Sequence, residues 1–293
     1  MKKKFIVLYS VILSFLFVSC DYGWSEFFGR GDEVNERSSQ MIDLDSISIA
    51  PSVDNSPTYS VVLFSDMHVG ITSDSDFEDF KKWVSNCKTT LGLMGYPVKF
   101  LISLGDVTNT GASEEYDTYR KYCKTMEDEL GLKTYSVVGN HDLYNSGWKY
   151  YKSRVFPYSS CYKFTTSAGG KNLSWYFFDT ASGTFGSEQI KAMKSNMERD
   201  PNEKLVFTHY PLFGNVLPYY ILQNVDERDL VVSFFAKNRV RKVFNGHTHI
   251  HLETNFGDYF TEHTLASFKR KRACAVLKVD QALGVYSYDC YEF

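Results

Sequence analysis

Short apolar runs alternate with amphipathic stretches over most of this chain, and each run stops abruptly at polar residues. The runs at residues 61–64, 98–104 and 134–138 are rich in β-branched, leucine and aromatic residues, which is typical of buried strands. Between them, apolar residues recur at helical spacing over residues 77–87 and 113–130. The order strand, helix, strand, helix, strand predicts a sheet with parallel strands joined by crossover helices.

The second half of the chain also alternates apolar runs with polar residues, but the predicted strands and helices follow in a different order. Runs at residues 173–178, 204–208 and 243–244 predict three more strands, and residues 187–197 predict a helix after the first of them. From residue 254 to the end, the pattern predicts strands and turns without a long helix. An α/β fold with two sheets and helices outside them accounts for this order.

The first twenty residues form a separate segment. Residues 2–4 are lysines, residues 5–18 are almost wholly apolar, and Ser19 then precedes Cys20. The apolar run is shorter than the roughly 20 residues of a membrane-spanning helix, and the layout is that of an export signal. An ordinary signal peptide or an anchor helix is the alternative. However, a cysteine after a small residue resembles a bacterial lipoprotein signal, and this resemblance implies cleavage before Cys20 and lipidation of its thiol.

We therefore expect an exported lipoprotein that Cys20 anchors to a membrane, on the periplasmic side or at the cell surface. Residues 21–58 have no clean hydrophobic period, and we predict a tether there with a short helix near residues 33–44. Aromatic residues within it are too apolar for a free linker, so this part either packs on the domain or lies against the membrane. The expected division is a signal peptide over 1–20, a tether over 21–58 and one domain over 59–293.

The composition narrows the choice of partners. The chain has 293 residues, of which 23% are charged and 16% aromatic, and its formal net charge is -3. This composition is that of a globular protein, and it gives no indication of nucleic-acid binding. The basic run at residues 269–272 precedes a predicted strand, and solvated strand ends explain it well.

Side chains that can bind metals gather where the predicted strands end, which is where open α/β sheets bind their ligands. The set holds five of the seven histidines, two carboxylates and an amide: Asp66, His68, Asp106, Asn140, His141, His209, His247 and His249. Imidazole, carboxylate and amide oxygen suit borderline divalent or trivalent metals, and the set contains no cysteine for a structural zinc site. Each residue alone is most simply a cap or core residue. Together, at five separate strand ends, they predict a catalytic metal site.

The order of these residues resembles that of the calcineurin-like metallophosphoesterases. The motifs are Asp66-x-His68, Gly105-Asp106, Gly139-Asn140-His141-Asp142, His209 and Gly246-His247-x-His249, each behind a predicted strand. The resemblance implies two mixed β-sheets packed as a sandwich with helices on both outer faces, a four-layer α/β/β/α fold. It also implies a hydrolase of small phosphate esters. The loop at residues 105–111 and the segment at 207–211 look most like the branch of cyclic-nucleotide phosphodiesterase-like enzymes, and phosphomonoesterase and phosphodiesterase both stay open.

The resemblance also implies a dinuclear metal centre with divided roles. Asp106 would bridge two metal ions; Asp66, His68 and His249 would complete one site, and Asn140, His209 and His247 the other. His141 would stabilise or protonate the leaving oxygen, and Asp142 would orient His141. Two cations about 3.5–4 Å apart offset the charge of a phosphate ester and lower the pKa of a bridging water, so that hydroxide can attack phosphorus in line. Mn, Fe, Zn, Co and Ni all accept these ligands.

A protein of another class is the alternative: a surface lipoprotein that uses the fold as a binding scaffold without turnover. A scaffold has no physical need for all seven ligands, so the enzyme is favoured. Five other residues near these motifs have plainer explanations. We expect His251 to be solvated or to support a ligand, His263 to lie at the surface, Asp179 to cap a helix or bond a ligand, and Cys87 and Cys123 to be buried.

The C-terminal cysteines raise the question of a disulfide. With Cys20 lipidated, five cysteines remain, so at least one has no intramolecular partner. Cys274 and Cys290 lie symmetrically about Ala282, in the middle of a predicted turn. If that turn closes a hairpin centred there, the two cysteines face each other across the strands. We predict that they are neighbours and leave the disulfide open.

Overall fold

The computed structural model describes residues 30–54, 56–214 and 220–293. The predicted signal sequence and Cys20 lie outside these residues. Among the helices that the structure describes, none combines the length and the hydrophobicity of a transmembrane span.

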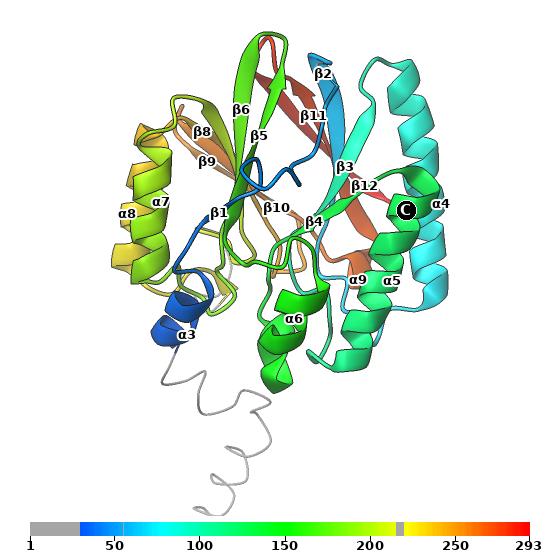
Figure 1. The fold of residues 1–293 in the computed structure, drawn as a ribbon, viewed down its shortest axis with the longest axis horizontal. Coiled ribbons are helices and arrows are strands. Elements are labelled where there is room, and N and C mark those ends of the chain that lie inside the picture. Colours follow the sequence, from blue (N-terminus) through cyan, green and yellow to red (C-terminus); the bar gives the residue numbers. More distant parts are fainter. Residues whose placement is uncertain (1–29, 55, 215–219) are drawn as a thin grey trace, which may run out of the picture.

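One sheet has five strands in the order β12-β11-β2-β3-β4. Its parallel part comprises β2 (Thr58–Phe64), β3 (Val98–Ser103) and β4 (Thr134–Ser136), and its antiparallel part comprises β11 (Ala273–Asp280) and β12 (Val285–Glu292). The crossovers are α4 (Asp74–Leu93) and α5 (Ser113–Leu130), and both lie on the outer face of this sheet (Figure 1). This part matches the predicted order of strands and helices.

The other sheet has seven strands in the order β1-β5-β6-β7-β8-β10-β9. The strands are β1 (Ile42–Asp43), β5 (Tyr162–Ala168), β6 (Lys171–Phe177), β7 (Glu203–Phe207), β8 (Val240–Asn245), β9 (Leu252–Phe256) and β10 (Phe260–Thr264). Strands β6, β7, β8 and β10 are parallel. The outer face carries α7 (Ser187–Met197) and α8 (Val225–Lys237), of which only α7 was predicted. The apolar residues of α8 run consecutively as Leu-Val-Val and Phe-Phe-Ala, which hides the helical period.

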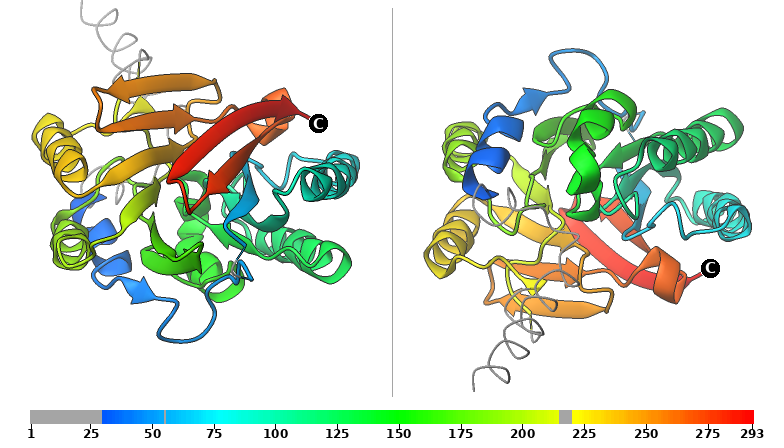
Figure 2. Two further views of the ribbon diagram at one scale, coloured as in Figure 1. Left: turned by 90° about the horizontal axis from the view of Figure 1, so that it is seen from above. Right: turned by 90° about the horizontal axis from the view of Figure 1, so that it is seen from below.

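The two sheets pack face to face, and helices cover both outer faces (Figure 2). Successive side chains of β2 show why. Tyr59, Val61 and Leu63 enter the core between the sheets, whereas Val62 and Phe64 pack under α4 and α5. A strand that is buried on both faces reads as a continuous apolar run. In the inter-sheet core, Trp175 stacks on Phe207 with ring centroids 5.6 Å apart. The predicted four-layer α/β/β/α fold is confirmed.

The described part of the predicted tether is packed on the domain. Its helix is α3 (Arg30–Arg37), which begins and ends earlier than predicted, and β1 then pairs with β5. Further along, Leu44 and Val53 are buried in the core between the sheets. This segment therefore completes the fold from residue 30 onward.

The register of the C-terminal hairpin corrects the prediction about its cysteines. Strand β11 pairs with β12 so that Cys274 faces Tyr291 and Ala275 faces Cys290. The centre of the hairpin thus lies half a residue beyond Ala282, which shifts the pairing of the strands by one residue. Because neighbouring residues of a strand point to opposite faces, this shift places the two cysteines on opposite faces of the sheet. The prediction that they face each other is wrong, and all five described cysteines are free.

Three short helices complete the end of the sandwich where the parallel strands finish: η1 (His141–Ser146), α6 (Trp148–Arg154) and α9 (Phe268–Lys271). The basic run at 269–272, predicted as solvated strand ends, mostly forms α9 instead. Lys269 and Arg272 both pair with Asp76 on α4, at 3.1 Å. Cys87 and Cys123 are half-buried, less than predicted.

Candidate metal centre

All seven predicted metal ligands lie at one end of the sandwich, where strands of both sheets finish. Asp66 and His68 follow β2, Asp106 follows β3 and Asn140 follows β4. From the other sheet, His209 follows β7, and His247 and His249 follow β8. The parallel strands of each sheet end together, and the packing of the two sheets brings these ends to the same place.

The backbone around these residues is unusual. Five of the seven have a positive φ: Asp66 at 54°, His68 at 50°, Asp106 at 50°, His247 at 67° and His249 at 60°. Residues other than glycine adopt this left-handed region rarely, and each such residue costs on the order of 1 kcal/mol or more. Backbone strain of this kind concentrates at functional sites. Here it turns each side chain away from its strand toward the common centre.

Two glycines allow the loops to cross closely. A Cβ atom at Gly139 would collide with the backbone of Asp106, and one at Gly246 would collide with the hydroxyl of Ser65. Each glycine immediately precedes a predicted ligand. The sequence therefore has glycine where the β3 and β4 loops meet, and again where the β2 and β8 loops meet.

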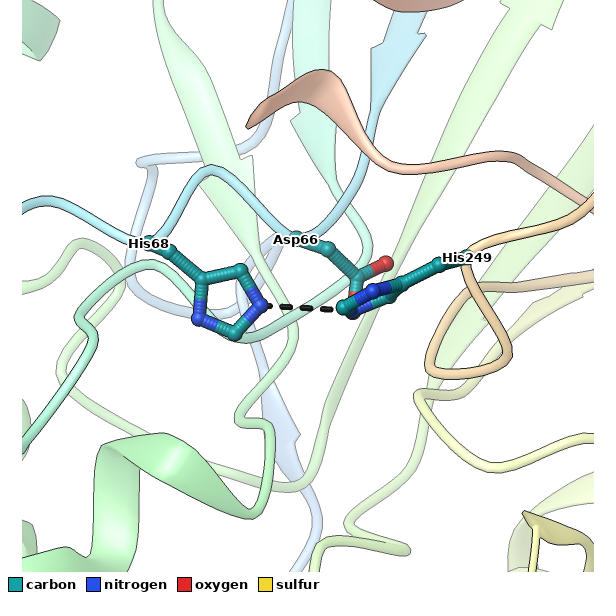
Figure 3. Close-up of side chains that lie close together, drawn as sticks. All are labelled: Asp66, His68 and His249. Atoms are coloured by element: carbon teal, nitrogen blue, oxygen red, sulfur yellow. Dashed lines mark hydrogen bonds and ion pairs between the residues drawn. The ribbon is translucent and has the colours of Figure 1, made fainter. Parts of the chain in front are cut away.

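The first group comprises Asp66, His68 and His249, which converge in Figure 3. The Nε2 atoms of His68 and His249 lie 3.3 Å apart, and Nε2 of His249 lies 3.1 Å from Oδ1 of Asp66. The other carboxylate oxygen of Asp66 accepts hydrogen bonds from the Ser65 hydroxyl at 2.5 Å and the His247 amide at 3.1 Å. These bonds leave Oδ1 directed at the two imidazoles.

The second group comprises Asp106, His209 and His247, with Asn140 beside them. Nε2 of His209 lies 3.4 Å from Oδ2 of Asp106 and 3.1 Å from Oδ1 of Asn140. The opposite ring nitrogen of His209 lies 2.8 Å from the Leu104 carbonyl oxygen, which fixes the ring. These contacts leave Nε2 as the atom that faces the centre.

Asp106 connects the two groups. Its Oδ2 atom also lies 3.9 Å from Nε2 of His68, so one carboxylate oxygen approaches a histidine of each group. Its other oxygen accepts the backbone N–H of His141 at 2.8 Å. A carboxylate at this position matches the role of a shared ligand.

The donor set fits bound cations. Two imidazole Nε2 atoms at 3.3 Å can share at most one hydrogen, and carboxylate and amide oxygens surround them. Among the residues that the structure describes, the buried Oδ1 of Asp66 has no hydrogen-bond partner, although His249 lies 3.1 Å away. Buried polar atoms without partners are rare, and lone pairs that point at each other are stabilised by a cation.

The electrostatics of the centre agree with this geometry. Burial alone would raise the pKa of Asp106, but the nearby imidazoles of His209, His141 and His68 hold it well below its usual range. Burial and the neighbouring His209 lower the pKa of His247 to about 3. Burial also lowers the pKa of His68, against the attraction of Asp106 and Asp66. The imidazoles of His68 and His247 are therefore neutral, the form that binds metals. His209 differs: against its burial, the carboxylates of Asp106 and Asp66 raise its pKa to about 9, so a metal ion would displace a proton from its ring.

His141 lies at the edge of the centre. Its Nδ1 atom lies 2.7 Å from the carbonyl oxygen of Asn109, and its ring is perpendicular to that of His68, with centroids 4.6 Å apart. His68, Asp106 and His141 also form a third set of donors close enough to hold a metal ion. Geometry alone therefore allows His141 to act as a ligand or to face substrate.

The carboxylate of Asp142 binds the backbone of two loops. Its buried carboxylate accepts the backbone N–H groups of Val107 at 3.3 Å, Thr108 at 2.9 Å and Gly139 at 2.9 Å, as well as the Thr108 hydroxyl. The carbonyl of Asn109 occupies the position beside His141. Asp142 thus ties the β3 and β4 loops together, and the predicted orientation of His141 by Asp142 would have to act through the backbone of these loops.

The other residues that the sequence singled out lie away from the donors. His251 approaches the Cys290 thiol at 3.7 Å and stacks on Tyr288. His263 is buried rather than at the surface, 2.9 Å from the Lys242 ammonium. The sequence did not indicate Thr180, whose hydroxyl accepts the backbone N–H of His209 at 3.1 Å. Its place three residues after the end of β6, at the same end of the sheet, was the available signal.

Comparisons with known proteins agree with the fold and the motifs. Residues 59–251 match the sequence profile of the family described as calcineurin-like phosphoesterase. A dimetal phosphatase from Danio rerio is similar in structure, with a TM-score of 0.60 and 13% identity over 78% of this chain and 93% of that one. Comparison with curated protein sequences gives no match.

Two nucleotidase structures are similar over part of their length. A 5′-nucleotidase from Candida albicans has a TM-score of 0.54 at 15% identity, and the alignment covers 80% of this chain and 52% of that one. A putative 5′-nucleotidase from Staphylococcus aureus has a TM-score of 0.53 at 14% identity, with 80% and 53% covered. This chain spans about half the length of these two proteins, and at such identities the likeness shows the fold alone.

Proposed function

The chain belongs to the calcineurin-like phosphoesterase family, and we propose that it is a metal-dependent hydrolase of phosphate esters. The observation that carries this proposal is the position of Asp106, which approaches His68 of one donor group and His209 of the other through the same carboxylate oxygen. Asp66, His68 and His249 would hold one metal ion, and Asn140, His209 and His247 a second. The donor types suit Mn, Fe, Zn, Co and Ni.

The reaction requires a nucleophile and a neutralised leaving group. Bound metal ions offset the charge of the phosphate and lower the pKa of a water molecule that acts as the nucleophile. His141 would serve the leaving group. Because its Nδ1–H donates to the Asn109 carbonyl, Nε2 is the ring atom that would deliver a proton to the leaving oxygen. The doubly protonated ring would give up its Nε2 proton and return to the neutral imidazole. Asp142 would contribute indirectly, by holding the loop that carries the Asn109 carbonyl.

Hydrolysis of model substrates tests the proposal. The purified protein is assayed with nitrophenyl phosphate and bis-nitrophenyl phosphate, with and without Mn²⁺. Release of nitrophenol that depends on the metal supports the enzyme, and the preferred substrate distinguishes phosphomonoesterase from phosphodiesterase. Metal binding without hydrolysis of either ester under any of the candidate metals would instead support the binding scaffold.

We further propose that the mature protein is an exported lipoprotein anchored through Cys20. Helix α3 packs at the end of the sandwich that carries the candidate centre (Figure 1). Nine residues lie between Cys20 and Arg30, where α3 begins, so the two ends are at most about 35 Å apart along the chain. The anchor would thus hold the centre close to the membrane surface. Labelling of cells with radioactive palmitate tests the anchor: wild type should carry label in the membrane fraction, and Cys20→Ala should carry none.

A further inference from the structure

Arg37 lies outside the region that matches the family, yet its side chain is buried against the loop at residues 179–182, which contacts the ligand His209. We propose that Arg37 is a positioning residue for the metal ligand His209, and that it acts through Asp179 and the loop at residues 179–182. The inference rests on the proposed metal centre. It assigns a role in that centre to the N-terminal extension.

The first link is a buried, two-pronged ion pair. The Nε atom of Arg37 donates to Oδ2 of Asp179 at 2.8 Å, and Nη2 lies 3.2 Å from Oδ1. The side chain of Arg37 is 5% exposed and that of Asp179 is fully buried. Nη2 also donates to the Ser182 hydroxyl at 3.0 Å. Arginine therefore holds both ends of the loop at residues 179–182, which a lysine with one charged atom could not match.

The second link runs from this loop to the metal ligand. Oδ1 of Asp179 accepts the backbone N–H of Ala181 at 3.1 Å, which shapes the turn. The residue between them, Thr180, presents its hydroxyl oxygen to two backbone N–H groups, those of His209 at 3.1 Å and Tyr210 at 2.9 Å. The β6 loop thus supports the β7 loop at the residue that carries the ligand.

Arg37 is itself held firmly. Its carbonyl oxygen accepts the Ser160 hydroxyl at 3.0 Å, and its guanidinium lies 5.9 Å from the ring of Trp148 on α6. Two residues earlier on α3, the Asn35 side chain accepts the backbone N–H of Glu188 at the start of α7. The N-terminal extension therefore has contacts of its own with the domain besides the ion pair. These contacts hold Arg37 in place, so that it can hold the loop at residues 179–182.

Replacing Arg37 by an uncharged residue would destabilise the loop at residues 179–182. The carboxylate of Asp179 would stay buried without its counter-charge, which is strongly unfavourable. The loop at 179–182 would rearrange to solvate it, and the Thr180 hydroxyl would move away from His209. Groups that orient a metal ligand without touching the metal typically change metal affinity by about 10–100-fold. The effect should fall on the metal ion that His209 binds.

The test is a titration of the metal-free full-length protein, purified in detergent, with Mn²⁺, followed by calorimetry. For wild type we expect two bound ions. Arg37→Met should lower the affinity for one Mn²⁺ ion by about 10–100-fold and the affinity for the other by less than about threefold. Arg37→Lys should recover part of the lost affinity. Thr180→Ala, which leaves the ion pair of Arg37 with Asp179 intact, should lower the affinity for the same Mn²⁺ ion.

Asp43→Asn is the matched control. Asp43 belongs to the same extension and pairs with Lys163 at 2.5 Å, on β1 and β5. Its loss should lower the melting temperature without changing either Mn²⁺ affinity. Unchanged affinities in both Arg37→Met and Thr180→Ala would overturn the inference, and so would an equal loss in Asp43→Asn. Two Mn²⁺ ions bound by wild type without ester hydrolysis would overturn the proposed function and leave this inference standing.

Discussion

The Nδ1 atom of His141 lies 2.7 Å from the backbone carbonyl oxygen of Asn109. A carbonyl can only accept a hydrogen bond, so Nδ1 carries a hydrogen in either protonation state of the ring, and Nε2 is the nitrogen left to exchange a proton. The contact therefore defines the tautomer of His141 through the backbone of the loop after β3. Asp142 binds the amides of Val107 and Thr108 in that loop, so under the proposed function it would act on His141 through the loop backbone.

His141→Asn should separate chemistry from metal binding. Under the proposed function the variant keeps both metal ions and loses about 10²–10⁴-fold in turnover, because the leaving oxygen no longer receives a proton. Elemental analysis and the nitrophenyl ester assay give the two measurements. His251→Asn is the control, since His251 lies outside the donor groups of the described residues. Loss of a metal ion in His141→Asn would show that His68, Asp106 and His141 bind it together.

Asp106→Asn should remove metal ions and activity together. The amide lacks the charge of the carboxylate, and one of its two ligand atoms becomes an NH₂ group that cannot bind a cation. We expect fewer than one metal ion per chain and turnover reduced by at least about 10²-fold, from the loss of charge stabilisation at the phosphate. Asp258→Asn, an exposed carboxylate between β9 and β10, should change neither. Two retained ions with full activity in Asp106→Asn would remove it from the shared position.

Glu262 should make stability depend on pH. Its side chain is buried, and burial raises its pKa to about 7 from 4.5, against hydrogen bonds from the amides of Leu212 and Phe213 and from the Asn245 side chain. The folded state therefore holds a proton that the unfolded chain has released. The stability from this group is fully present below pH 4.5 and is lost as pH rises to 7.

Glu262→Gln removes this titration. Relative to wild type, its free energy of unfolding should rise by on the order of 2–3 kcal/mol between pH 5 and pH 8. Urea unfolding at several pH values measures the difference, and Glu198→Gln at an exposed position is the control. A difference that stays constant with pH would contradict the raised pKa of Glu262.

The cysteines at the C-terminal hairpin should differ in reactivity. Cys290 is exposed and Cys274 is buried on the other face of the sheet. A maleimide should therefore label Cys290 first in the native protein, and Cys290→Ser should abolish that fast reaction. Electrophoresis with and without reductant should give the same mobility. A reductant-dependent shift that Cys274→Ser removes would place the two cysteines in one disulfide and contradict the register.

The sequence by itself determined the layers of the fold and the seven candidate ligands. Both depend on local pattern: strands buried on both faces are apolar throughout, and polar residues follow where such strands end. His209 and His247 could be placed in one site from these rules alone. The same rules overlooked α8, because its consecutive apolar residues obscure the helical period.

Only the tertiary structure decided how the ligands are supported. The partner of His141 is a backbone carbonyl, and the partners of Asp142 include backbone amides. Every residue has such backbone groups, so the identity of the side chains does not predict these hydrogen bonds. The ion pair of Arg37 with Asp179 joins residues 142 positions apart, and the register of β11 and β12 depends on a half-residue shift of their turn. Such contacts arise from where distant backbones come to lie, and a local pattern of residues carries no information about that.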